Sequence, residues 1–179
     1  RSLYMVDPNT DHSSGMTQQI WCIVNALLIG HFLNRDIVIF HGFCVDYNRY
    51  DMPILIHQIL DIAQTNSQLE TEGFRSRLCD IDPLPKIPWK HGNYNYPMMK
   101  PCCNAPAETR FEEMIRSLRV EKDIKINLGS TFVNPLLYYY SEREQLKEMA
   151  LTIMSCFVPG PKIAEQIDLR KSLFNGSQY

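Results

Sequence analysis

The chain has 179 residues, of which 45% are hydrophobic and 21% are charged, and its net charge is −2. This composition excludes a disordered, collagen-like or coiled-coil chain and supplies enough apolar residues for a folded core. The near-neutral charge argues against a nucleic-acid-binding protein, whose phosphate contacts need a basic face. The length favours one domain, and we expect residues 1–179 to form it.

The first forty residues have the pattern of a strand, a loop, a helix and a second strand. Leu3–Val6 is a short apolar run, and Ile20–His31 carries apolar residues at helical spacing on nearly every face. Such a helix is expected to be largely buried, as one packed on a sheet would be. Ile37–Phe40 is a β-branched run typical of a strand buried on both faces. The order predicts an α/β protein with a parallel sheet.

The middle of the chain is less regular. The spacing predicts a short helix within Ile54–Ile62, and then six of the eleven prolines fall between Asp82 and Pro106. That density predicts a long irregular segment. A helix over Glu108–Arg119 and a strand over Ile124–Leu128 are expected after it.

Two helices are predicted near the end. Ser141 and Glu144 have the spacing of a capping box, in which each residue satisfies a free amide of the first helical turn. The core face expected for this helix consists of Leu146, Met149, Ala150, Ile153, Met154 and Phe157. Pro161 is expected at the first position of a last helix, which extends to Leu173.

Several classes of site are disfavoured. The six cysteines are irregularly spaced without a CxxC pair, and no HExxH motif is present, so we expect no metal site. Cys156 lies in an apolar helical pattern and is expected to be a buried free thiol, whereas the redox compartment stays open. The longest apolar run is too short to span a membrane. The sequence does not distinguish cytoplasm from the secretory lumen.

The candidate ligand site is the segment between the first strand and the buried helix. It contains His12, Ser14, Gly15, Met16, Gln18 and Gln19. A loop at the carboxyl end of a parallel strand, leading into a helix N-terminus, is the usual ligand position in open α/β sheets. Free amides there favour an anion. The alternative is a plain strand-to-helix turn, because neither GxGxxG nor a P-loop occurs.

The segment from Ser14 to Ile20 resembles the glycine–leucine–glycine–asparagine–glutamine–leucine motif that opens GDP-fucose-dependent fucosyltransferases of the GT-B architecture. The order of strand, motif, apolar helix and short strand is similar too. The resemblance implies a Rossmann-like open, mainly parallel sheet with flanking helices, as in the N-terminal domain of a GT-B glycosyltransferase. Two departures stand out: Gln18 replaces the family asparagine, and no His-x-Arg strand is present. The resemblance therefore implies the acceptor-side half, with the nucleotide-binding half expected past Tyr179.

The function implied by the resemblance is inverting transfer of fucose from GDP-fucose to a glycan or protein hydroxyl. GDP-fucose is then the donor substrate, and no cofactor or metal is implied. Gly15 and its neighbours would line the sugar-nucleotide side of the cleft, Gln18 would make a polar contact, and His12, His41 and Asp46 would lie on the acceptor side. No residue is assigned as catalytic.

Two other functions stay open. One is a non-catalytic module on the same fold that binds a glycan or a protein through the tyrosine-rich segments Tyr94–Tyr96 and Tyr138–Tyr140. The other is a stand-alone α/β protein that binds phosphate. Turnover of GDP-fucose would exclude the non-catalytic binding module. The stand-alone phosphate-binding protein predicts saturable phosphate binding by these residues alone.

Overall fold

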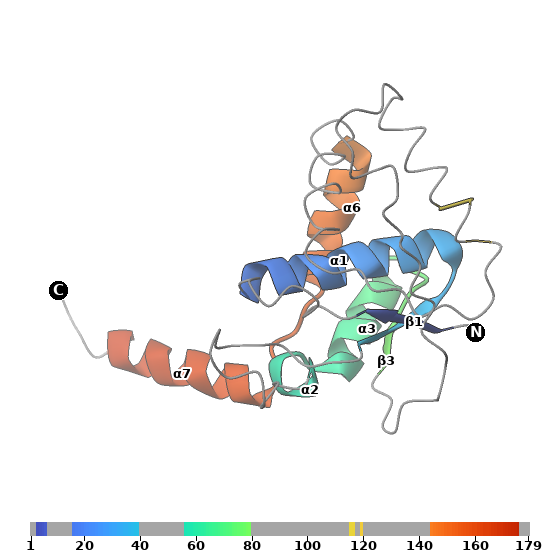
Figure 1. Cartoon of the computed structure of the whole chain (residues 1–179). Coiled ribbons are helices and arrows are strands. Elements are labelled where there is room, and N and C mark those ends of the chain that lie inside the picture. The colour runs from blue at the N-terminus through green and yellow to red at the C-terminus, as the bar shows by residue number, and fades with distance from the viewer. Residues whose placement is uncertain are drawn as a thin grey trace.

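The computed structural model describes residues 3–6, 16–39, 56–79, 115–116, 119 and 144–175 of the chain. This part is mostly helical and holds a small parallel sheet. The elements in chain order are β1 (Leu3–Val6), α1 (Met16–Leu33), β2 (Asp36–Ile39), α2 (Ile56–Ile59), α3 (Ile62–Thr71), β3 (Leu78–Cys79), α6 (Glu144–Ser155) and α7 (Pro161–Asn175). Figure 1 shows α1 beside the sheet, with α6 standing against it.

The three strands form one parallel sheet in the order β1-β2-β3. Leu3 of β1 lies opposite Asp36 of β2, and Ile37 of β2 lies opposite Leu78 of β3. The predicted order of a strand, a helix and a second, parallel strand is therefore confirmed, while the loop predicted between β1 and α1 lies outside the described residues. β3 has only two residues, and the sequence pattern does not predict it.

Helix α1 forms the centre of the core. Every residue from Ile23 to Gly30 is buried, as its apolar pattern predicts. The helix packs on β1 and β2 and, on another side, against α6. Because apolar contacts surround it, its side chains contribute to the core on almost every face.

A Schellman motif ends α1 and directs the chain into β2. The Arg35 N–H donates to the Gly30 carbonyl at 2.9 Å, and the Asn34 N–H donates to the His31 carbonyl at 3.2 Å. Asn34 has a φ of 52°, a left-handed conformation that asparagine adopts more readily than most residues. A turn this tight brings the last turns of α1 close to the start of β2.

Helix α6 presents the predicted apolar face to the core. Leu146, Ala150 and Ile153 are buried, while Met149 and Met154 are partly buried and pack against the same cluster. Cys156, just after the helix, is a buried free thiol, as predicted. Burial is the main cause that raises the pKa of this thiol, and the nearby Glu72 carboxylate adds to it.

The helix predicted within Ile54–Ile62 is shorter than expected, because the chain from α6 to α7 crosses it. The Asp61 N–H donates to the Val158 carbonyl at 2.9 Å, and the Gly160 N–H donates to the Ile59 carbonyl at 2.6 Å. Asp61 then caps a new helix, α3, by accepting from the Gln64 N–H. These long-range bonds divide the segment into α2 and α3.

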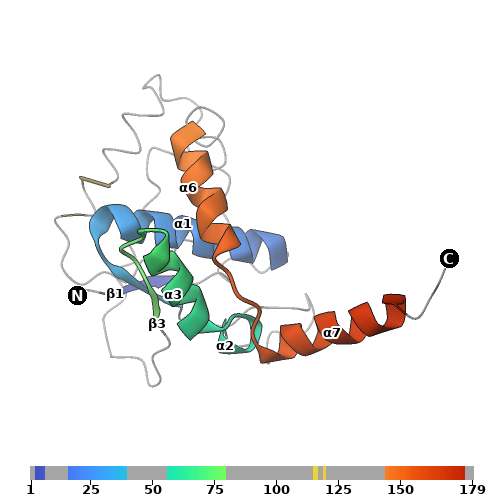
Figure 2. The same cartoon turned by 180° about the vertical axis from the view of Figure 1, so that it is seen from behind.

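Helix α7 begins at Pro161 as predicted and projects away from the rest of the molecule (Figures 1 and 2). Its contacts with other elements are made to α2. Three apolar side chains of α7 are exposed, namely Ile163, Ile167 and Leu169. The helix therefore gains little stability from packing within the described part of the chain.

Several predictions concern residues outside the described ranges. They are the irregular segment Asp82–Pro106, most of the helix Glu108–Arg119, the strand Ile124–Leu128, the serine of the capping box, and both tyrosine-rich segments. Of the predicted helix, Ile115, Arg116 and Arg119 are described and helical, and Ile115 is buried.

Candidate functional site

The carboxyl ends of the three strands meet at one edge of the sheet. Because the strands are parallel, the chain leaves β1 at Val6, β2 at Ile39 and β3 at Cys79 on the same side. Helix α1 runs back antiparallel to the strands that it connects, so its first turn begins on this side as well. The topology therefore brings three strand ends and one helix N-terminus to this edge, which we call the carboxyl edge.

The predicted site residues divide between described and undescribed parts of the chain. Met16, Gln18 and Gln19 belong to the first turn of α1. Outside the described residues lie His12, Ser14 and Gly15, which precede α1 in the sequence, and His41 and Asp46, which follow β2. The structure thus brings the three helical residues to the carboxyl edge and describes no contact between them and the other five.

The first turn of α1 is suited to an anionic ligand. The first four N–H groups of a helix have no carbonyl partner within it, and the helix dipole adds a partial positive charge there. No acidic residue occurs in this turn itself, so the turn carries no carboxylate of its own that would repel an anion. Phosphate oxygens of a nucleotide are the kind of group that such a turn can bind.

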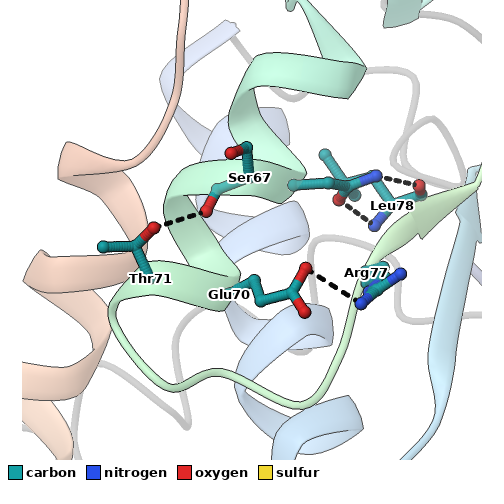
Figure 3. Close-up of polar contacts among 6 residues, drawn as sticks. Ser67, Glu70, Thr71, Arg77 and Leu78 are labelled. Atoms are coloured by element: carbon teal, nitrogen blue, oxygen red, sulfur yellow. Dashed lines mark hydrogen bonds and ion pairs between the residues drawn. The ribbon is translucent and has the colours of Figure 1, made fainter.

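The side-chain amide of Asn66 covers the outer side of β3 at Leu78, whose backbone hydrogen bonds are drawn in Figure 3. Its side-chain Nδ2 donates to the Leu78 carbonyl at 2.8 Å, and its Oδ1 accepts from the Leu78 N–H at 2.8 Å. The amide thereby occupies both backbone groups that a fourth strand would need at Leu78. Glu70 pairs with Arg77 at 3.0 Å beside it, and both of these side chains are largely exposed. The backbone of Leu78 therefore has no free group for a further strand on this side.

We expect Asn66→Ala to lower the free energy of unfolding by about 2 kcal/mol, because two backbone groups of Leu78 lose their partner. Urea denaturation followed by circular dichroism measures this loss. Gln68→Ala, at an exposed position of the same helix, is the matched control and should change stability by less than about 0.5 kcal/mol. Equal effects of the two substitutions would show that the Asn66 amide does not hold β3.

A cleft of about 290 Å³ lies at the other end of α1. His31, Glu72 and Phe74 line one side, and residues of α6, including Glu148 and Met149, line the other. Burial, followed by the charge of Arg75, lowers the pKa of His31. The sequence alone gives His31 no special role, because a lone histidine in a helical pattern carries no sign of its partners.

Other classes of site find no support in the described ranges. Among those residues, no group of three or more His, Cys, Asp and Glu side chains is arranged to hold a metal ion. In the same part of the chain, no helix combines the length and apolar character needed to cross a membrane.

Comparison of the chain with protein-family models, with curated proteins and with solved structures gives no match. The assignment of function therefore depends on the sequence motif and on the geometry of the carboxyl edge.

Proposed function

We propose that this chain is the acceptor-side half of an inverting glycosyltransferase that uses GDP-fucose, with the sugar nucleotide bound at the carboxyl edge beside the first turn of α1. The single observation that carries the proposal is the position of Met16–Gln19, the described part of the motif, in the first turn of α1, the helix that links the parallel strands β1 and β2. The acceptor would be a hydroxyl of a glycan or a protein. In this proposal the fold is a Rossmann-like open sheet.

The strand order supports this location. Asn66 occupies the outer side of β3 at Leu78, and in this proposal the sheet continues past β1. The chain order then reverses at β1, and ligands of open α/β proteins bind at the carboxyl end of the strands where such a reversal occurs. The segment that follows β1 is the one that carries the fucosyltransferase-like motif.

The chemistry of the transfer assigns distinct tasks to this edge. The acceptor hydroxyl attacks the anomeric carbon, the bond to the GDP oxygen breaks, and the hydroxyl proton passes to a base. Amides of the first turn of α1 would stabilise negative charge on the donor, and Gln18 would hydrogen-bond the sugar nucleotide. The grip on the diphosphate would come from the nucleotide-binding half that the resemblance implies.

The exposed helix α7 also favours a two-part protein. In both views α7 projects on the side where α1 begins (Figures 1 and 2). Ile163 and Ile167 lie one helical turn apart and are each 37% exposed, which leaves an apolar strip uncovered. In the proposed enzyme the nucleotide-binding half packs near this helix and faces the carboxyl edge.

We expect the natural protein to release GDP from GDP-fucose in the presence of an acceptor, and Gln18→Ala to lower kcat/KM by about tenfold through loss of a hydrogen bond to the donor. A coupled assay for GDP over a panel of glycan and peptide acceptors measures the rate. Gln18→Asn, which restores the residue of the family motif, should retain activity. Gln68→Ala in α3 is the matched control and should stay within about twofold.

The same assay distinguishes the second candidate, a non-catalytic binding module. Gln18 in place of the family asparagine favours that candidate. Saturable glycan binding without GDP release would support the module and contradict the enzyme. GDP release that is unaffected by Gln18→Ala would place the donor site elsewhere.

A further inference from the structure

His31 fastens the C-terminal end of α1 to the segment that leads into β3. The Arg75 N–H donates to Nδ1 of His31 at 3.2 Å, across 44 positions of sequence. The ring also lies edge-on to Phe32 and Phe74, with centroid distances of 5.5 and 5.3 Å. Because Nδ1 accepts, the neutral ring carries its proton on Nε2.

A second bond holds the same segment more firmly. The Ser76 hydroxyl donates to the Leu27 carbonyl at 2.6 Å, and both groups are buried. The backbone carbonyl of the next residue, Arg77, accepts from the Ile37 N–H at 2.7 Å and so joins this segment to β2. Phe74 is held as well, because its N–H donates to the Leu69 carbonyl at 2.8 Å and its side chain is buried in the core. Loss of the His31 contact would therefore release the Arg75 amide while Phe74 and Ser76 stay in place.

Solvent reaches the ring through the cleft between this segment and α6. The charged groups around it act in opposite directions. Arg75 disfavours a protonated ring, and the Arg119 guanidinium, which donates to the Phe32 carbonyl at 3.5 Å, adds positive charge nearby. Glu72, after α3, and Glu148, on α6, line the cleft with carboxylates that favour protonation.

We propose that His31 is a pH-operated latch, in which uptake of one proton at Nδ1 breaks the bond from the Arg75 N–H and opens this backbone amide to solvent. In the imidazolium both ring nitrogens are donors, so Nδ1–H and the Arg75 N–H face each other without an acceptor. The new charge also lies beside the Arg75 guanidinium and can turn toward the carboxylates of the cleft. The latch is independent of the proposed transferase activity, because it lies at the opposite end of α1.

The direction of the pH dependence follows from the burial of the ring. The pKa of His31 is lowered from 6.5 by burial first and by Arg75 second. The folded protein therefore holds the neutral ring more strongly than the unfolded chain does. The stability that this bond contributes is present above pH 6.5 and is lost as the pH falls from 6.5 through the lowered pKa of His31. Over that range the bond from the Arg75 N–H to His31 breaks.

The test is the hydrogen exchange of the Arg75 amide, followed by NMR on the 179-residue chain between pH 7.5 and 5 and corrected for intrinsic exchange. We expect its protection to fall by at least about threefold over this range. The Leu60 amide, which is bonded to the Ile56 carbonyl at 2.8 Å, should keep its protection. Protection of Arg75 that does not change with pH, or that falls no more than that of Leu60, would overturn the proposal.

Two variants separate the latch from a general effect of acid. His31→Gln offers an amide oxygen that does not titrate, and it should abolish the pH dependence of the Arg75 amide. His57→Gln, at an exposed histidine of α2, should leave that dependence unchanged. If His31→Gln does not fold, the NMR titration of the wild-type ring decides the question. A proton on Nδ1 at neutral pH, or a midpoint at or above 6.5, would contradict the latch.

Discussion

Gly30→Val is expected to lower the free energy of unfolding by about 3 kcal/mol, as overpacking of a closed contact does. A Cβ atom at this position would lie 2.8 Å from the Arg35 carbonyl oxygen and 2.9 Å from both the Ile37 Cδ1 and the Ser76 Cβ. Two of these neighbours cannot move freely, because Arg35 belongs to the Schellman turn and Ser76 is bonded to α1. Urea denaturation followed by circular dichroism measures the loss.

Ala63→Val is the matched control for this substitution. Ala63 is exposed on α3, so the change adds a β-branched residue to a helix without a steric conflict. It should cost about 0.5 kcal/mol through helix propensity alone. If Gly30→Val lowers the free energy of unfolding no more than Ala63→Val does, the close approach of α1 to the start of β2 and to the segment before β3 is contradicted.

Ile153→Ala is expected to destabilise the protein by about 3 kcal/mol, because it removes buried methylene groups and leaves a cavity. Ile153 of α6 is 0% exposed and belongs to the cluster that includes Leu27 and Leu28 of α1. This loss of stability tests whether α6 packs on α1. The two helices are more than a hundred residues apart in the sequence. Thermal and urea unfolding both report the loss of stability.

Leu151→Ala provides the control within the same helix. Leu151 is 49% exposed, two positions from Ile153, and alanine favours a helix slightly more than leucine does. Its truncation should change stability by less than about 0.5 kcal/mol. Similar losses for both variants would mean that α6 does not present this face to α1.

The sequence predicts those parts of the fold in which one local pattern suffices. The apolar run of α1 predicts a buried helix, because nearly every face carries apolar residues, and the β-branched run after it predicts β2. The core face of α6 follows from its helical spacing, and Pro161 marks the start of α7. In each case the residues that decide the structure lie within a few turns of one another.

Other features depend on contacts that no local pattern reports. β3 consists of Leu78 and Cys79 alone, and it is held by the amide of Asn66 and by the Ile37 N–H. The break between α2 and α3 arises where Val158 and Gly160 bond to Asp61 and Ile59, about a hundred positions earlier. The apolar spacing within Ile54–Ile62 predicts one helix, but these tertiary hydrogen bonds divide it into two.

The candidate site shows the same division. The motif from Ser14 to Gln19 predicts a ligand position between β1 and α1, and the parallel pairing of β1 with β2 brings the first turn of α1 to the carboxyl edge. The role of Asn66 in limiting where the sheet can grow has no sequence signal, since a single polar residue in a helix resembles any exposed one. His31 is equally hidden, because its partner Arg75 is 44 positions away.

The most direct test of the proposed donor site is hydrogen exchange in the first turn of α1, measured on the natural protein with and without saturating GDP-fucose. The amides of Met16–Gln19 lack helical partners, so a bound phosphate or sugar should slow their exchange by about tenfold. The amides of Glu144–Lys147, in the first turn of α6, should not change. Unaltered exchange at Met16–Gln19 under saturating GDP-fucose would contradict the proposed function.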